Sequence, residues 1–189
     1  MLKKIAFEKL RTGDLIHCTS RSFMATAIRL REVGIKRLYD LNVATHTGIV
    51  AILNTPTAKG ENVISIAEMK NEGFKLNSFS DYMKKGIFDS GIISITRHNA
   101  LDDPNTLAKY KEELFRLWSE GKKYDWEGCL KWAFPFLKEK NKDFYCSELA
   151  EHLALYCGFS YYRKDIPEKP SDNVMPYTLQ KSGFMTKIL

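Results

Sequence analysis

The 189-residue sequence has few of the features that mark membrane, repeat or low-complexity proteins. No apolar run approaches the roughly 20 residues that a membrane-spanning helix needs, so we expect no transmembrane segment. Only 6 prolines and 11 glycines are present, and they form neither a linker nor a repeat. We therefore expect residues 1–189 to form a single domain, since this length is sufficient for one hydrophobic core.

Cysteine is also scarce, with four residues at positions 18, 129, 146 and 157. None belongs to a C-x-x-C pair, and the spacings match no pattern of zinc ligands. A chain of this length does not need disulfides to hold a small core together. We therefore expect no disulfide framework, no structural metal and no cofactor.

The first residues, Met1 to Ile5, include two lysines but no apolar segment and no small-residue cleavage site. They do not read as a signal peptide. A cytoplasmic location is therefore the default expectation.

Basic residues outnumber acidic ones by 29 to 23, which gives a net charge of +6. This excess fits either solvated helix faces or attraction to an anionic partner such as phospholipid or cell-wall polymer. No arginine-rich run or nucleic-acid motif accompanies it, so no specific nucleic-acid partner is expected. The sequence leaves the oligomeric state open. The densest basic groups are Arg29, Arg31, Lys36 and Arg37, and Lys138, Lys140 and Lys142.

Hydrophobic periodicity predicts short strands followed mainly by helices. Strands are predicted at 14–18, 45–53, 62–68 and 91–97, and the second and third are expected to pair antiparallel across a turn. Helices are predicted at 20–33, 102–118, 126–137, 146–157 and near 177–181. This segregation indicates an α+β fold, with helices packed on one face of an antiparallel sheet.

Cys146 is the cysteine whose position best suits chemistry, because it stands where a helix begins. A helix N-terminus lowers the pKa of a thiol placed there, and its N–H groups can receive an oxyanion. The alternative is that Cys146 is a small buried hydrophobic residue. Cys18, Cys129 and Cys157 lie on strand or helix faces and are expected to belong to the core.

His46 is the histidine best placed to serve a nucleophile, because it stands at the start of a strand. His152 lies six residues beyond Cys146 on the same helix, on a different face, and cannot be its partner. His98 is expected in a loop, and His17 could face either side of its strand. A purely structural role for His46 remains the alternative.

Glu68 ends the strand predicted to pair with that of His46. A hairpin places the start of one strand beside the end of the next, so the two side chains could meet. The alternative is that Glu68 joins Glu61, Lys70 and Glu72 as ordinary surface charge.

These segments together resemble the circularly permuted branch of the NlpC-type papain-like fold, the YiiX-like family. The resemblance covers about residues 10–176, and its motifs are short but ordered. They are Gly13-Asp14-Leu15-Ile16, Thr19-Ser20-Arg21-Ser22, His46-Thr47-Gly48-Ile49, Ile66-Ala67-Glu68, Tyr124-Asp125 and Tyr145-Cys146-Ser147-Glu148-Leu149. The basic stretch 32–45, which includes Leu38 and Tyr39, departs from the family pattern and is expected to shape substrate access.

The resemblance implies a cysteine peptidase or amidase with Cys146 as nucleophile, His46 as general base and then acid, and Glu68 as the residue that orients His46. The implied substrates are peptides or small amides, peptidoglycan fragments among them. Relatives that move acyl groups on lipids leave an acyl lipid as the alternative substrate. A binding module without turnover, and a viral or phage accessory protein of the same fold, are further alternatives.

Overall fold

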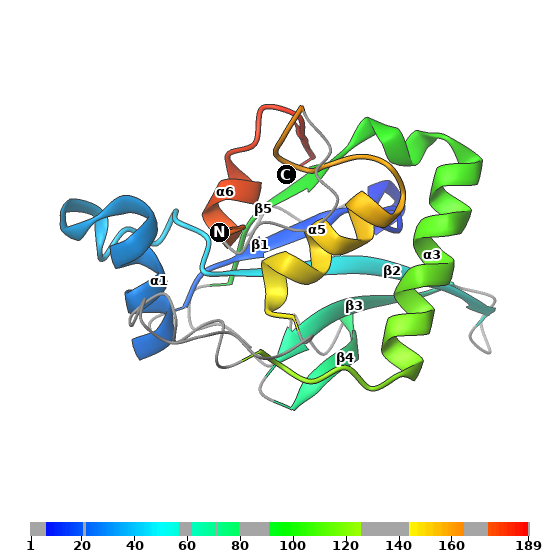
Figure 1. Ribbon diagram of the computed structural model, residues 1–189, viewed down its shortest axis with the longest axis horizontal. Helices are drawn as coiled ribbons and strands as arrows, with labels where there is room; N and C mark the ends of the chain where they lie inside the picture. Colours follow the sequence, from blue (N-terminus) through cyan, green and yellow to red (C-terminus); the bar gives the residue numbers. More distant parts are fainter. Residues whose placement is uncertain are drawn as a thin grey trace.

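The structure is a computed structural model that describes residues 7–20, 22–56, 62–70, 72–79, 91–125, 144–164 and 174–188. Figure 1 shows a twisted sheet crossed by α5, with α3 packed beside it and α1 extending beyond one end. The elements in chain order are η1 (Phe7–Lys9), β1 (Leu15–Cys18), α1 (Phe23–Val33), η2 (Ile35–Arg37), β2 (His46–Pro56), β3 (Asn62–Lys70), β4 (Gly73–Ser78), β5 (Ile92–Arg97), η3 (Asn99–Asp102), α3 (Pro104–Ser119), α5 (Cys146–Tyr156), α6 (Pro176–Gln180) and β6 (Thr186–Lys187).

The sheet has six strands in the order β4-β3-β2-β1-β5-β6, and every neighbouring pair is antiparallel. The predicted pairing of the second and third strands is confirmed, since Ile49 lies opposite Ala67. An α+β fold with an antiparallel sheet and helices is therefore confirmed. Two strands, β4 and β6, were not predicted. The helix predicted at 126–137 lies outside the described residues.

Two apolar clusters lie on the two faces of the sheet, because side chains alternate along each strand. One cluster joins the strand residues Leu15, Ile49 and Ala67 to helices α3 and α5, through residues such as Leu114 and Leu149. The other contains Ile16, Val50, Ile66 and Ile95. This packing fixes α5 against β2 and β3, which carry His46 and Glu68.

The helix ends follow local sequence signals. Ser22 caps α1 by accepting a hydrogen bond from the Ala25 N–H (3.2 Å), and Gly34 ends it with a positive φ of 72°. Asp103 caps α3 in the same way at the Thr106 N–H (2.8 Å), ahead of Pro104. The predicted helix at 102–118 therefore begins at Pro104, and the residues before it form the short 3₁₀ turn η3.

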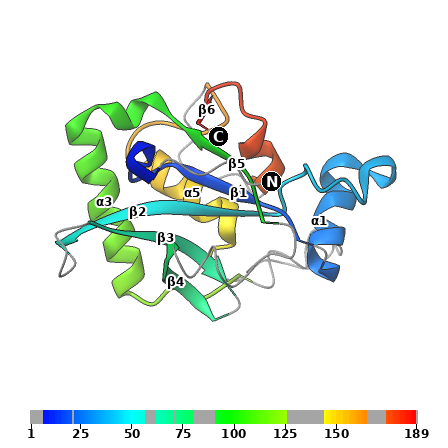
Figure 2. The same cartoon turned by 180° about the vertical axis from the view of Figure 1, so that it is seen from behind.

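Both views place the start of β2 and the start of α5 at the end of the sheet that faces α1 (Figures 1 and 2). None of the helices in the described part of the chain is both long and apolar enough to cross a bilayer.

Candidate functional site

Cys146 is the first residue of α5, and two tethers fix this helix start. The Glu148 carboxylate accepts a hydrogen bond from the Tyr145 N–H (3.3 Å), and the Ser147 hydroxyl donates to the Val174 carbonyl (2.6 Å). The first N–H groups of a helix have no partner within it. Cys146 is buried, with 4% of its surface exposed, and it lies at a helix start whose backbone N–H groups could receive an oxyanion.

His46 is the first residue of β2 and lies between a carboxylate and a thiol. Its Nε2–H donates to Glu68 Oε2 at 2.7 Å, and its side chain is also hydrogen bonded to Cys146. Since Nε2 is taken by Glu68, Nδ1 is the ring nitrogen left for the thiol. The structure thus brings all three predicted site residues together, although 100 residues separate His46 from Cys146.

The electrostatics of His46 favour its charged form. Burial alone would lower the pKa of His46, but attraction and hydrogen bonding from Cys146, together with those from Glu68, outweigh it and raise the pKa to about 10. The ordinary pKa of histidine is about 6.5, and a pKa this much higher keeps the His46 imidazole protonated, and so positively charged, at neutral pH. The ring can therefore hold a proton beside the sulfur.

Glu68 is fully buried, and three side chains surround its carboxylate. One oxygen accepts from His46, while the other pairs with Lys70 Nζ (2.6 Å) and accepts from Asn77 Nδ2 (2.8 Å). Burial would raise the pKa of Glu68, but His46 and Lys70 lower it below its ordinary value. The buried charge is thus compensated, as a buried ion must be.

Lys70 and Asn77 are site residues that the sequence analysis did not single out. Lys70 was considered only as surface charge, yet it lies two residues beyond Glu68 on the same strand, which places both side chains on one face. That spacing was an available signal. Asn77 belongs to β4, which was not predicted, and no sequence signal connected it with Glu68.

Tyr124 and Asp125, part of the family resemblance, lie beside the chain that leads into Cys146. Tyr124 forms an isolated parallel bridge with Phe144, and the Asp125 N–H donates to the Phe144 carbonyl (3.2 Å). Asp125 is fully buried. The pair therefore helps to position the start of α5.

The other histidines lie away from this cluster. His17 is fully buried, its Nε2 is 2.8 Å from the Thr96 hydroxyl, and burial lowers its pKa to about 3. His98 accepts a hydrogen bond from the Ala100 N–H at the start of η3. Neither ring is available as a base for Cys146.

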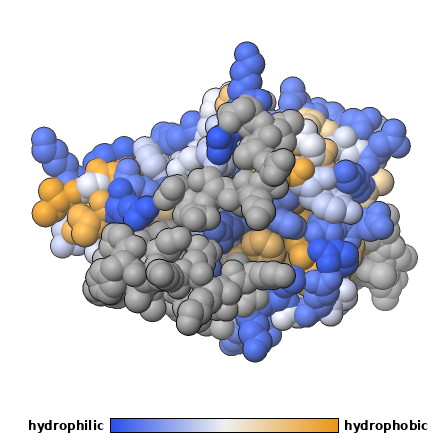
Figure 3. Space-filling view, viewed as in Figure 1, coloured by the Kyte–Doolittle hydropathy of each residue, from blue (hydrophilic) through white to orange (hydrophobic). Residues whose placement is uncertain are grey.

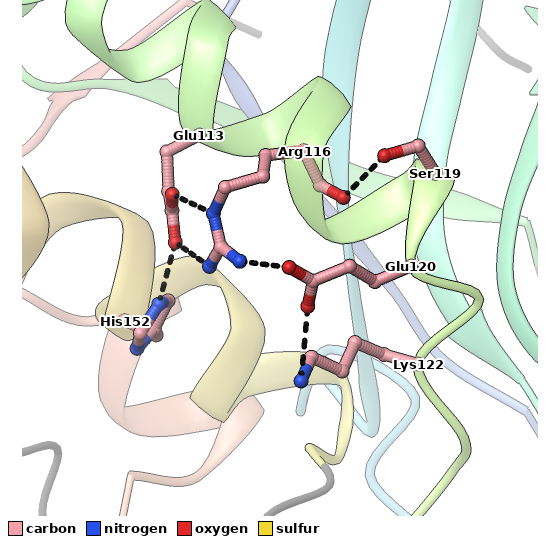
Figure 4. Close-up of polar contacts among 6 residues, drawn as sticks. All are labelled: Glu113, Arg116, Ser119, Glu120, Lys122 and His152. Atoms are coloured by element: carbon pink, nitrogen blue, oxygen red, sulfur yellow. Dashed lines mark hydrogen bonds and ion pairs between the residues drawn. The ribbon is translucent and has the colours of Figure 1, made fainter.

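His152 is a satisfied histidine in a charged network between α3 and α5 (Figure 4). Its Nε2 is 3.1 Å from Glu113 Oε1, and Glu113 also pairs with Arg116 at 2.7 Å. Arg116 and Lys122 both pair with Glu120 in turn. The expectation that His152 is not the partner of Cys146 agrees with this arrangement.

Of the other cysteines, Cys18 is fully buried, as expected for a core residue. Cys157 is only half-buried, at the end of α5. Burial raises the pKa of Cys157 to about 11. Cys129 lies outside the described residues.

A solved structure is similar to this chain over nearly its whole length. It is the metalloprotein YiiX from Escherichia coli O157:H7, described as DUF1105, with a TM-score of 0.64 and 17% sequence identity. The similarity covers 95% of this chain and 96% of that chain. No protein-family model and no curated protein matches the sequence. Similarity at this identity concerns the fold alone, and the chain has a YiiX-like fold.

Proposed function

We propose that this protein is a cysteine hydrolase of the permuted papain-like type that cleaves amide bonds through an acyl-enzyme. The observation that supports this most directly is His46, which is hydrogen bonded to Glu68 through Nε2 and also to Cys146. A nucleophile, a base and a group that orients the base are the parts that covalent hydrolysis requires.

In the proposed reaction, the Cys146 sulfur attacks the substrate carbonyl carbon as a thiolate, and His46 carries the proton. N–H groups at the start of α5 stabilise the oxyanion. His46 then protonates the departing amine, which leaves an acyl group on Cys146. Water attacks the acyl group as His46 takes its proton, and the acid product and the free thiol are released.

Glu68 keeps the imidazole in one orientation and tautomer during this cycle. Its second oxygen, held by Lys70 and Asn77, fixes the carboxylate itself. A wrongly held imidazole presents the wrong nitrogen to the nucleophile. Lys70 and Asn77 are therefore positioning residues that act through Glu68.

YiiX is described as a metalloprotein, which raises the question of a comparable site in this chain. Among the described residues, no group of three or more histidine, cysteine or acidic side chains is arranged to hold a metal ion. The side chain of His46 is hydrogen bonded to both Glu68 and Cys146. The described residues therefore do not fit a metal centre, and no step of the proposed reaction uses a metal.

Mass spectrometry tests the substrate class. Small amides, lipid esters and cell-wall fragments are incubated with the protein and with Cys146→Ala, and we expect amide cleavage that is lost in the variant. Cleavage of lipid esters alone would show that the protein is an acyl-lipid hydrolase and not an amidase. No turnover of any class would favour a binding module.

Selective alkylation tests the nucleophile without a substrate. Iodoacetamide reacts with thiolate, which is scarce for an ordinary cysteine at pH 6, whereas the proposed mechanism requires a nucleophilic sulfur on Cys146, beside His46. Peptide mapping should therefore find label on Cys146 before Cys18 and Cys157. His46→Ala should slow this labelling, whereas His152→Ala, a matched loss of one histidine, should not. Equal labelling of these cysteines in folded protein would contradict the proposal.

A further inference from the structure

A pocket of about 370 Å³ lies between α1 and the segment that follows η2. Its described walls are Thr26 and Arg29 on α1, and Tyr39 and Leu41 on the facing segment. Tyr39 is 85% exposed and stands at the rim. The described walls of the pocket thus combine one cation and the hydroxyls of Thr26 and Tyr39 with an aromatic ring and the apolar Leu41.

Arg29 is an unusual residue to find in such a wall, because it is only 2% exposed. Its Nη2 donates to the Thr19 hydroxyl (2.5 Å) and to the Ser20 carbonyl. Its Nε is buried without any acceptor. A buried donor without a partner is costly, so this guanidinium retains unused capacity for an acceptor.

The acids near the pocket are already engaged elsewhere. Asp40, which attracts Arg29 electrostatically, is paired with Arg37 (2.7 Å) and accepts from the Asn42 N–H (2.9 Å). Glu32 accepts hydrogen bonds from the N–H groups at the start of α6. Within the described part of the chain, no carboxylate forms an ion pair with Arg29. Its charge is therefore not neutralised by an ion pair with any described carboxylate.

The pocket adjoins the candidate catalytic site through a short set of hydrogen bonds. Ser20, which accepts from Arg29, donates its N–H to the Thr45 hydroxyl (3.2 Å), and the Thr45 N–H donates to the Cys18 carbonyl (2.8 Å). Thr45 precedes His46 directly. Figures 1 and 2 likewise place α1 beyond the end of the sheet where β2 begins.

Exposed apolar side chains lie near the pocket, among charged ones. Figure 3 shows hydrophobic atoms at the end of the molecule formed by α1 and η2, where Leu30 and Ile35 are 51% and 77% exposed. A ligand that suits both the buried cation and this surround carries an anionic group on an apolar stem.

We propose that the Arg29 pocket binds a carboxylate or phosphate group borne on an apolar stem. This group is the end of the substrate that lies away from the bond attacked by Cys146, an assignment that rests on the proposed function. Arg29 was one of the basic residues whose excess suggested an anionic partner, and its burial distinguishes it from the solvated Lys36 and Arg37.

Calorimetric titration of the Cys146→Ala protein tests binding without turnover. The probes are hexanoate, hexyl phosphate, inorganic phosphate and neutral 1-hexanol. We expect hexanoate and hexyl phosphate to bind about tenfold or more tightly than 1-hexanol, because a charge-assisted hydrogen bond to Arg29 is worth at least that factor. Equal binding of hexanoate and hexanol would overturn the proposal. Equal binding of inorganic phosphate and hexyl phosphate would contradict the proposal that the pocket also binds the apolar stem.

Substitutions at Thr26 keep Arg29 and its structural hydrogen bonds intact. Thr26→Glu places a carboxylate in the pocket and should weaken anion binding about tenfold or more beyond the effect of Thr26→Gln, which takes the same space without the charge. Equal effects of the two would contradict the assignment. Anion binding without any hydrolysis by the unmodified protein would refute only the proposed function, and hydrolysis without anion preference would refute only this inference.

Discussion

At the scale of single residues, the site depends on a charged carboxylate in a fully buried position. Glu68 has no exposed surface, and its two oxygens contact His46, Lys70 and Asn77. Burying an ion costs several kcal/mol unless its partners compensate. Each of the three contacts therefore serves stability and orientation together, and removing Glu68 would leave Lys70 and His46 without their shared partner.

Glu68→Gln should separate charge from shape at this position. The amide can still accept from His46 but no longer helps to raise the pKa of His46 above its ordinary value. In the unmodified protein kcat/KM should fall as pH rises through about 10, where the imidazolium is lost. In Glu68→Gln this fall should occur at lower pH, and kcat should decrease roughly 10²-fold or more.

The pH–rate profile with an amide substrate is the measurement for Glu68→Gln. Glu68→Ala serves as comparison and should be less active still, because it removes the hydrogen bond as well as the charge. An unchanged profile in Glu68→Gln would exclude Glu68 from the site.

The meeting of His46, Glu68 and Cys146 could be predicted from the sequence, because a hairpin joins the first two and a helix start identifies the third. Their roles in catalysis stay predictions. Asn77 could not be predicted, since its hydrogen bond to Glu68 depends on the pairing and register of the short strand β4 against β3, which local sequence does not determine. The Arg29 pocket was equally inaccessible, because burial of a lone arginine depends on tertiary packing.

At the scale of elements, Gly48 lets β2 and β3 approach closely enough for His46 to reach Glu68. A Cβ at Gly48 would lie 2.6 Å from the Ile66 Cγ2 methyl group and 3.9 Å from Glu68 Cβ. No real contact is as short as the first of these, so a side chain here must push the two strands apart. The glycine in the His46-Thr47-Gly48 motif thus has a steric explanation.

Gly48→Ala should therefore destabilise the fold by about 1–3 kcal/mol, the usual cost of overpacking, and slow the alkylation of Cys146. Urea unfolding and labelling rate are the measurements. Combining Gly48→Ala with Ile66→Leu, which removes the branched methyl group, should recover part of both.

Gly183→Ala is the matched control, because nothing lies within 4 Å of a Cβ at that position. It should change neither stability nor labelling appreciably. If Gly48→Ala behaves like Gly183→Ala, close approach of the strands is not what the glycine provides.

The sequence predicted the longer elements better than the short ones. Helices α1, α3 and α5 carry capping residues and apolar stripes, and β2 and β3 are long and β-branched. By contrast β6 has two residues, too few for any periodicity, and it forms only because it pairs with β5. Strand order also depends on these late pairings and could not be inferred from local signals.

At the scale of the whole molecule, hydrogen bonds to one carboxyl group connect α1 and α6. This group is partly buried, and burial disfavours its charged form. Glu32 on α1 accepts from the N–H groups of Tyr177 (3.0 Å) and Thr178 (3.1 Å) on α6. Burial raises the pKa of Glu32 to about 8, although these two hydrogen bonds oppose the shift. Folding therefore holds a proton on Glu32 at pH values where the unfolded chain releases it.

This arrangement predicts that stability falls as pH rises from 7 to 9. Glu32 and His46 both have folded pKa values, about 8 and about 10, above their unfolded values of 4.5 and 6.5, so the native state binds more protons across this range. Each such proton lowers the free energy of unfolding by about 1.4 kcal/mol per pH unit. His17 and His98, whose pKa values burial lowers, are neutral in both states above pH 7 and do not oppose the trend.

Urea unfolding at pH 7, 8 and 9 measures this dependence, and Glu32→Gln assigns it. The amide oxygen can accept hydrogen bonds from the same N–H groups, but the amide does not titrate. The loss of stability between pH 7 and 8 should therefore become smaller. Glu112→Gln, at an exposed position on α3, is the matched control and should leave the slope unchanged. Part of the remaining loss, which extends toward pH 10, belongs to His46 and should be absent in His46→Ala, while Cys157, whose pKa burial raises to about 11, contributes to the loss above pH 8 in both proteins. A slope between pH 7 and 8 that is the same with and without Glu32 would mean that its proton is not held by the fold.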